Sequence, residues 1–193
     1  LESMGQAAAA VQANLGRAGD LIQNFKQVAV DQSTVQERDF DLAAYLDEIV
    51  LSLRPRFRGT GFRLDVDCPA GIVLHGDAGA LYRVISNLVV NSLDHGFAGM
   101  LTGTIVIAAR RGDEGVVIDY RDDGCGMTRE QQQRIYEPFY TTRRGRGGTG
   151  LGMHIVWTNV KQVLGGTISC VSAPGRGTRF TLTIPQHVEA SHA

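Results

Sequence analysis

The sequence contains few cysteines, and their spacing fits neither a disulfide framework nor a zinc site. Cys68, Cys125 and Cys170 are the three cysteines in 193 residues, and no two of them form a CxxC pair. A small odd number of isolated cysteines argues against a disulfide-stapled fold and favours a reducing compartment. We therefore expect a cytoplasmic domain.

Long apolar runs and a targeting segment are also absent. No hydrophobic stretch approaches the roughly 18 residues of a membrane span, and no signal-peptide pattern opens the chain. The net charge of −1 argues against a nucleic-acid-binding protein, while the 43% hydrophobic content suffices for a core. The chain begins in mid-pattern, so we expect a piece of a longer protein. Any anchoring in the inner membrane would then come from upstream segments.

Acidic residues are missing from one long interval, between Glu137 and Glu189. Isolated cations in that interval, such as Arg176 and Arg179, are expected to be solvated surface charges. Arg143, Arg144 and Arg146 are different, because they are crowded into a glycine-rich loop. Such a cluster favours a phosphate partner.

Residues 1–33 carry apolar side chains at alternating spacings of three and four, the seam of a coiled coil or helix bundle. Gly5, Gly16 and Gly19 each lower the helix propensity by roughly 1 kcal/mol relative to alanine. Packing against another helix must therefore stabilise the segment. The partner is a second copy of the chain or a preceding helix, and we expect a homodimer.

A second, compact region covers residues 38–186. Alternating or apolar runs predict a short edge strand at 38–40 and further strands at 62–67, 72–75, 104–110, 116–122, 167–172 and 178–184. Capping residues and periodicity predict helices at 42–53, 78–93, 129–136 and 151–164. Most strands form hairpins, which indicates an α+β fold with a mixed, mostly antiparallel sheet and helices on one face. Residues 187–193 are expected to be a frayed tail.

Four polar residues recur every fourth position on the helix predicted at 78–93. Arg83, Asn87, Asn91 and His95 make a stripe along one face, opposite an apolar face. The stripe is either an ordinary exposed surface or a site for a hard cation. An asparagine carbonyl oxygen suits Mg²⁺, which takes its other ligands from phosphates and water.

Asp122 continues the apolar face of its predicted strand, where a carboxylate needs a partner. The exocyclic amine of adenine is one such partner, and Gly124 and Gly126 would let the backbone pass close to a flat ring. The alternative is an ordinary Asp-Gly turn.

Residues 145–150 match the GxGxxG pattern, but a dinucleotide-binding fold is rejected. That fold needs an apolar strand just before the glycines and an acidic residue about 20 positions later. Here Thr-Thr-Arg-Arg precedes the glycines, and no acid follows until Glu189. The glycines instead lead into a helix beginning near Leu151, whose free N–H groups would face phosphates.

Five motifs in order and spacing resemble those of the sensor histidine kinases of two-component systems, over residues 38–185. Residues 87–91 (NLVVN) resemble the N box, 122–126 (DDGCG) the G1 box and 137–142 (EPFYTT) the F box. Residues 148–152 (GTGLG) resemble the G2 box and 175–178 (GRGT) the last glycine motif.

The resemblance implies the ATP-binding fold shared with gyrase, Hsp90 and MutL-type ATPases, a two-layer α/β sandwich with an ATP lid. Residues 38–186 would be the catalytic domain. Residues 1–33 would be the second helix of the dimerisation and histidine phosphotransfer hairpin. A response-regulator receiver domain is the implied protein partner, and ATP and Mg²⁺ are the implied cofactors.

The resemblance also assigns roles. Asp122 would bind the adenine amine, Asn91 would coordinate Mg²⁺, and Asn87 would sit beside metal and phosphates. With Arg143 of the lid, the two asparagines would be the catalytic residues. The implied ATP-binding set is Asn87, Asn91, His95, Asp122, Gly124, Gly126, Met127, Phe139, Tyr140, Thr141, Thr142, Arg143, Arg144, Gly148, Thr149, Gly150, Leu151, Gly152 and Thr178.

Three departures limit what this chain is expected to do alone. Asn87 stands where ATP-hydrolysing members of the fold have a glutamate base, and an amide cannot accept a proton at neutral pH. Asp94 replaces a frequent lysine. None of the five histidines has the context of a phosphoacceptor, so the acceptor is expected upstream of Leu1.

Two other functions stay open at this stage. One is a Ser/Thr protein kinase of the anti-sigma-factor type on the same fold, against which the dimerisation helix argues. The other is a nucleotide-binding pseudo-kinase that acts as a scaffold, against which the intact glycine motifs argue.

Overall fold

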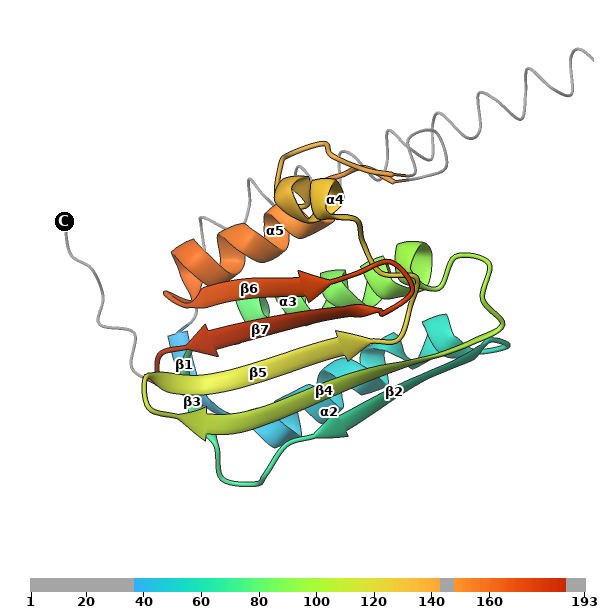
Figure 1. Ribbon diagram of the computed structural model, residues 1–193. Coiled ribbons are helices and arrows are strands. Elements are labelled where there is room, and N and C mark those ends of the chain that lie inside the picture. Colours follow the sequence, from blue (N-terminus) through green and yellow to red (C-terminus); the bar gives the residue numbers. More distant parts are fainter. Residues whose placement is uncertain (1–36, 143–147, 187–193) are drawn as a thin grey trace, which may run out of the picture.

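A five-stranded mixed sheet forms one layer of the domain. The computed structural model describes residues 37–142 and 148–186, so the helix predicted at 1–33, the lid residues Arg143 and Arg144, and the tail lie outside the described residues. The strands are β2 (Gly61–Asp67), β4 (Thr102–Gly112), β5 (Gly115–Asp122), β6 (Thr167–Ser172) and β7 (Thr178–Ile184). Their order is β2-β4-β5-β7-β6, with β2 parallel to β4 and the other pairs antiparallel (Figure 1).

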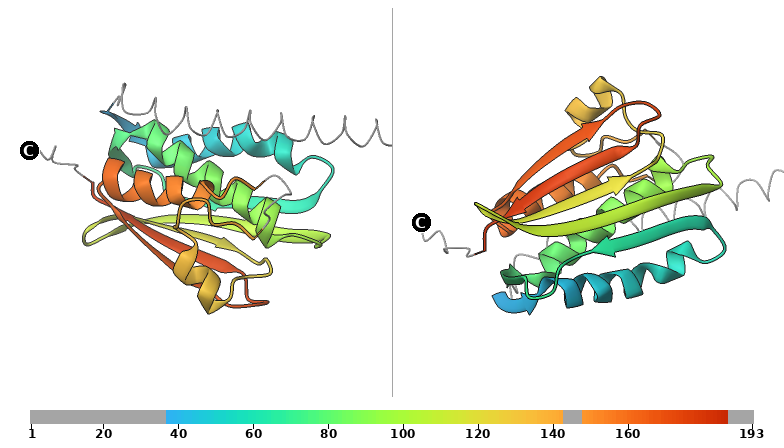
Figure 2. Two further views of the ribbon diagram at one scale, coloured as in Figure 1. Left: turned by 90° about the horizontal axis from the view of Figure 1, so that it is seen from above. Right: turned by 60° about the horizontal axis from the view of Figure 1, so that its bottom comes forward.

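Helices cover one face of this sheet. They are α2 (Leu42–Leu53), α3 (Ala78–Asn91) and α5 (Gly152–Thr158), with the π-helical turns η2 (Ser92–Gly96) and η3 (Asn159–Val163) extending α3 and α5. Seen from above, α2, α3 and α5 lie on the same side of the sheet (Figure 2). The short helix α4 (Arg129–Arg134) lies apart from this layer and contacts the edge strand β6. The predicted fold class is confirmed.

Local signals explain where the helices begin. Asp41 Oδ1 accepts a hydrogen bond from the Ala44 N–H at 2.9 Å, and Asp77 Oδ1 accepts one from the Ala80 N–H at 3.1 Å. Thr128 and Gln131 form a reciprocal capping box at the start of α4. Pro55 lies in a 3₁₀ turn directly after α2, as expected for a residue that cannot continue a helix.

The N-terminal strand does not join the edge of the main sheet. Instead β1 (Glu37–Asp41) pairs with β3 (Val73–Asp77) in a separate two-stranded antiparallel sheet, with Phe40 opposite Leu74. The prediction of strands at both places was correct. The partner was not predictable, because short strands give no signal for which neighbour they pair with.

The core lies between the sheet and the helices. Ile105, Ile107, Ile118, Tyr120 and Leu182 of the sheet are fully buried against the apolar face of α3 and residues of α2 and α5. Each such side chain contributes about 1.5–3 kcal/mol on burial. Because α3 buries its apolar face here, its polar stripe must point away from the sheet, along the side where α5 packs.

Arg179 is not the solvated surface charge predicted from the sequence. Its Nε and Nη2 atoms donate to the two carboxylate oxygens of Asp119, at 2.8 and 2.9 Å, and Thr181 Oγ1 also donates to Asp119 at 2.8 Å. Asp119 and Thr181 lie directly opposite each other on β5 and β7. Asp119 keeps only 9% of its side chain exposed, while Arg179 keeps 45%. The hydrogen bonds from Arg179 lower the pKa of Asp119, and burial opposes that shift.

Within the described ranges, no helix combines the length and hydrophobicity needed to cross a membrane.

The Asp119→Asn variant should lower the free energy of unfolding near neutral pH by about 1–2 kcal/mol, because it replaces a hydrogen-bonded carboxylate. The folded-state pKa of Asp119 lies below its unfolded value. Its stabilisation is therefore complete above the unfolded pKa and is lost as the pH falls through the folded pKa. Denaturant titrations from neutral to acidic pH should show the two proteins converging in acid. A constant difference would contradict this account.

Candidate functional site

A pocket of about 830 Å³ opens beside α3, between the loop that follows β5 and the segment that leads into α5. Most of the sequence-predicted site residues line it. These are Asn87, Asn91, His95, Asp122, Gly126, Met127, Tyr140, Thr141, Thr142, Gly148, Thr149, Gly150, Gly152 and Thr178. They fall in residues 87–95, 122–127, 140–142 and 148–152 and at Thr178, so the pocket is a product of the tertiary fold.

Asp122 lies at the end of β5 and is held by three other parts of the chain. Its Oδ2 atom accepts from Ser92 Oγ at 2.7 Å, and its Oδ1 atom accepts from the N–H groups of Gly124 (3.1 Å) and Thr178 (3.2 Å). Burial raises the pKa of this carboxyl, and the three hydrogen bonds oppose the shift. A carboxylate has about four acceptor positions, so these donors leave one open. Its position fits an amine donor from a ligand in the pocket.

Ser92 and Tyr120 support Asp122, and the sequence analysis missed both. The Ser92 hydroxyl lies 2.7 Å from the hydroxyl of Tyr120, which is fully buried. Ser92 directly follows Asn91 but is not part of the stripe of residues spaced four apart, so the periodicity did not indicate a role for it. Tyr120 lies in the strand predicted at 116–122, and an aromatic residue there gave no functional signal. Burial raises the pKa of Tyr120 well above its usual value, so the phenol stays protonated as a hydrogen-bonding group.

The loop after β5 is joined to the last glycine motif by backbone hydrogen bonds. The Gly177 N–H donates to the Gly124 carbonyl (3.0 Å), and the Gly175 N–H donates to the Cys125 carbonyl (2.7 Å). Gly126 has a φ of 66°, and a Cβ there would collide with the carbonyl oxygen of Ala173. This close approach explains why glycine is needed at that position.

A glutamine side chain reinforces the same junction. Gln132 of α4 donates to the Ser172 carbonyl at 2.8 Å and accepts from the Ser172 N–H at 3.3 Å, as a neighbouring strand would. Ser172 Oγ accepts from the Met127 N–H at 2.8 Å and donates to the Gly177 carbonyl at 2.7 Å. This end of the pocket is therefore held by many short contacts.

The polar stripe that begins on α3 contacts residues on both sides of the lid, Thr142 before it and Gly152 after it. The Nδ2 atom of Asn87 donates to the Arg83 carbonyl at 2.8 Å. A Cβ on Gly152 would lie 3.1 Å from Asn87 Oδ1 and 3.6 Å from the amide atoms of Asn91, so the first residue of α5 packs on both amides. His95 Nδ1 lies 3.1 Å from Thr142 Oγ1. The reading of the stripe as an ordinary exposed surface is therefore wrong.

Five predicted site residues do not line the pocket or lie outside the described part of the chain. Arg143 and Arg144 belong to the latter group. Gly124 contributes its N–H to Asp122, while Leu151 is buried in the protein interior. Phe139 is 60% exposed and has a φ of 64°, an unusual value for a residue other than glycine.

The buried Asn91 amide is a polar group that the protein itself does not satisfy. Its Nδ2 atom is buried and has no hydrogen-bond partner. Such a group costs about 1–3 kcal/mol unless a ligand or water satisfies it. The pocket thus offers a carboxylate acceptor and an amide N–H group without a partner, which suits a molecule that has both an amine and oxygen acceptors.

A family model described as "Histidine kinase-, DNA gyrase B-, and HSP90-like ATPase" matches residues 76–188, which include Asp122 and both asparagines. The chain belongs to this family. The resemblance inferred from the motifs is confirmed, and with it an ATP-binding domain of the sensor histidine kinase type.

Relatives and solved structures agree with this assignment. The signal transduction histidine-protein kinase BaeS of Escherichia coli is 29% identical over 92% of this chain and 38% of its own length. Sporulation kinase B of Bacillus subtilis is 30% identical over 91% of this chain and 40% of its own. The catalytic domain of histidine kinase ThkA is similar in fold, with a TM-score of 0.68 at 22% identity, covering 78% of this chain and 96% of that domain. The chain thus spans about two fifths of the length of these curated relatives.

The Asp122→Asn variant should bind ATP about tenfold to hundredfold more weakly, because it replaces a charged acceptor with an amide. The same variant should melt at a higher temperature without ligand. Burial raises the folded-state pKa of Asp122, so its ionisation costs stability as the pH rises through that pKa. Calorimetric titration and thermal melting near neutral pH measure both effects.

The neighbouring Asp123 provides a matched control. Its Oδ1 atom accepts from the Thr104 N–H at 2.7 Å, and it is not among the pocket-lining residues. Asp123→Asn should leave ATP affinity unchanged. Equal ATP affinity of wild type and Asp122→Asn would remove Asp122 from the site.

Proposed function

We propose that residues 38–186 bind Mg·ATP and transfer its γ-phosphoryl group to a histidine on a helix upstream of Leu1, for relay to an aspartate of a response-regulator receiver domain. The observation that carries the proposal is that the half-buried Asp122 carboxylate lines the same pocket as Asn87, Asn91 and Gly152. A nucleotide with its adenine at Asp122 would extend its phosphates toward the two asparagines and Gly152.

The individual roles are proposed from the family motifs and from the residues that line the pocket. Asp122 would accept from the adenine amine, with Gly126 and Met127 beside the ring and Thr178 at the carboxylate. His95, Tyr140 and Thr141 would lie along the nucleotide, with Thr142, Arg143 and Arg144 in the lid. The backbone of residues 148–152 would bind phosphate oxygens with its N–H groups.

The metal would be held by few protein atoms. Among the described residues, no three His, Cys, Asp or Glu side chains are placed to bind a metal ion together. Asn91 would supply one amide oxygen, and phosphate oxygens and water would complete the octahedral shell that Mg²⁺ requires. When bound, Mg²⁺ would neutralise charge on the phosphates during transfer.

The proposed reaction depends mainly on positioning. A histidine ring nitrogen would form a bond to the γ-phosphorus while the bond to the bridging oxygen breaks and ADP leaves with the electron pair. Asn87 cannot activate water as a base. The site would therefore favour transfer to a positioned side chain over hydrolysis.

The proposal includes a dimer partner. Residues 1–33 would be the second helix of the dimerisation hairpin, and their apolar seam would pair in a homodimer. The names of BaeS and sporulation kinase B support a kinase of this kind.

A chain extended upstream of Leu1 should become phosphorylated by ATP at histidine. The expected product is an acid-labile, base-stable phosphoprotein that requires Mg²⁺ and disappears in Asn91→Ala. Radiolabel transfer with acid and base treatment measures it. Acid-stable phosphate on a partner protein would instead indicate a Ser/Thr kinase, and ATP binding with no phosphoprotein would indicate a pseudo-kinase scaffold.

Wild-type protein should release free phosphate from ATP more slowly than the extended chain forms phosphohistidine. An Asn87→Glu variant should hydrolyse ATP faster than wild type, because a carboxylate can accept a proton from water. Asn87→Ala, which provides no base, is the control. Rapid metal-dependent phosphate release by wild type would contradict the role assigned to Asn87.

A further inference from the structure

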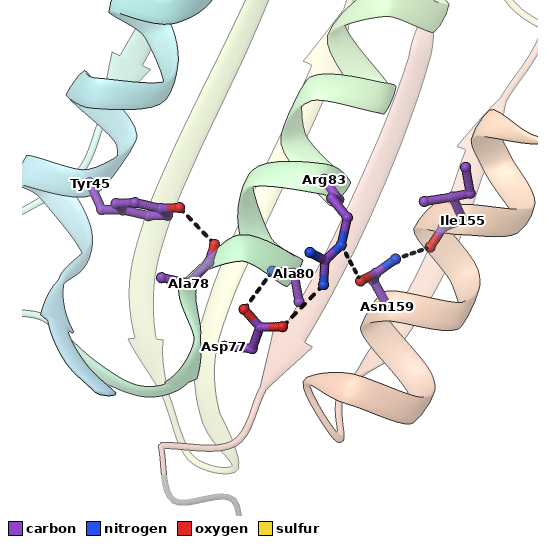
Figure 3. A network of polar contacts seen from close by, with 7 residues as sticks. All are labelled: Tyr45, Asp77, Ala78, Ala80, Arg83, Ile155 and Asn159. Atoms are coloured by element: carbon purple, nitrogen blue, oxygen red, sulfur yellow. Dashed lines mark hydrogen bonds and ion pairs between the residues drawn. The ribbon is translucent and has the colours of Figure 1, made fainter. Parts of the chain in front are cut away.

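Arg83 is the one residue of the α3 stripe to which the proposed function gives no role. Its Nη2 atom donates to Asp77 Oδ2 at 3.0 Å, and its Nε atom donates to Asn159 Oδ1 at 2.9 Å (Figure 3). Asp77 is the residue that caps α3, through Oδ1 and the Ala80 N–H. Asn159 in turn donates from Nδ2 to the Ile155 carbonyl at 2.8 Å. Arg83 therefore joins the start of α3 to the middle of the α5–η3 helix.

This network is shielded from solvent. The side chains of Arg83 and Asp77 are 11% and 12% exposed, and Asn159 is 6% exposed. Burying charges costs free energy unless they are paired and hydrogen-bonded, and here both conditions are met. The geometry is specific, because a planar guanidinium donates in two fixed directions to two different elements.

The stripe on α3 and the helix α5 run in opposite directions along each other. His95 lies against Thr142, Asn87 and Asn91 lie against Gly152, and Arg83 bonds Asn159. Gly152, where α5 begins, is thus next to the two asparagines, and Asn159 is two turns further along the same helix. A displacement of the helix at Asn159 would be carried along its length to Gly152.

We propose that Arg83 is a positioning residue, which acts through Asn159 to fix the register of α5 against α3. By this means it holds Gly152 and the glycines before it at the distance from Asn87 and Asn91 that the phosphates of a nucleotide require. The inference rests on the proposed function, since it assigns the phosphate end of the pocket to these residues. Asp122 is held by hydrogen bonds from Ser92, Gly124 and Thr178, and none of these involves Arg83 or Asn159.

A positioning role and a purely structural role predict different binding results. If Arg83 only stabilises the fold, its loss should lower the melting temperature and leave the relative affinities for nucleotides unchanged. If it sets the register of α5, its loss should weaken binding of the phosphates and spare binding of adenosine.

The test measures affinities for ATP with Mg²⁺ and for adenosine, by calorimetry and NMR titration respectively, in Arg83→Met, in Asn159→Leu and in the double variant. Each single variant should bind ATP about tenfold more weakly, a typical energetic coupling between linked sites. Adenosine affinity should stay within about twofold of wild type. The double variant should be no worse than either single one, because both remove the same contact.

Two further variants serve as a negative and a positive control. Asp119→Asn destabilises the opposite face of the sheet and should leave the ratio of ATP to adenosine affinity unchanged. Gly152→Ala adds a Cβ 3.1 Å from Asn87 Oδ1 and should lower that ratio as Arg83→Met does. Thermal melts show which variants are still folded at the temperature of the titrations. If Arg83→Met does not fold, Asn159→Leu alone still tests the proposal, because it leaves the Arg83–Asp77 pair intact.

The outcomes separate the two proposals. A fall in ATP affinity with adenosine spared, non-additive in the double variant, supports the positioning role. Parallel loss of both affinities, or an unchanged ratio, overturns it while the proposed function stands. Failure of wild-type protein to bind either ligand would overturn the proposed function and this inference together.

Discussion

The half-buried carboxylate of Asp122 is the group on which the pocket depends. Ser92 after α3, Gly124 in the loop after β5 and Thr178 at the start of β7 all donate to it, so one side chain joins the helical layer, a loop and the sheet. Burial alone would make this charge costly, and the three donors compensate for much of that cost. An acceptor of this kind has a fixed direction before any ligand arrives. Because burial raises the pKa of this carboxyl, a ligand that donates a hydrogen bond to it would offset part of the cost of its charge.

The two faces of α3 make different kinds of contact. One face of the helix packs Leu81, Val84 and Leu88 into the core, and the opposite stripe meets the segment that returns to the sheet. Residues spaced four apart lie along one side of a helix, but this spacing does not reveal which element packs against that side. Here it is α5, and the contact becomes possible because Gly152 has no side chain. The apolar face fixes the position of α3 against the sheet, and this position brings the polar stripe into contact with the start of α5.

Sequence reasoning succeeded where the signal is local. The caps Asp41, Asp77 and Thr128 predicted where helices begin, and the last hairpin was predicted with the bounds of β6 and β7. It failed where contacts join residues far apart in the chain. The pairing of β1 with β3, the Asp119–Arg179 ion pair and the Ser92–Asp122 bond each depend on the completed fold. The motifs directed attention to Asn91 and Asp122, which both line the pocket, whereas Ser92 and Tyr120 look like ordinary core residues until they are seen together.

The two ends of the pocket are built by different kinds of contact, and this affects how they respond to change. The Asp122 end is a junction of backbone hydrogen bonds between Gly124, Cys125, Gly175 and Gly177, reinforced by Gln132. Backbone contacts of this sort tolerate most side-chain substitutions nearby, since they do not depend on which side chains are present. The Asn91 end depends on two helices held in register by side chains, with Gly152 packed directly on two amides. Under the proposed function, substitutions in the helical layer should therefore weaken binding of the phosphates more readily than binding of adenine.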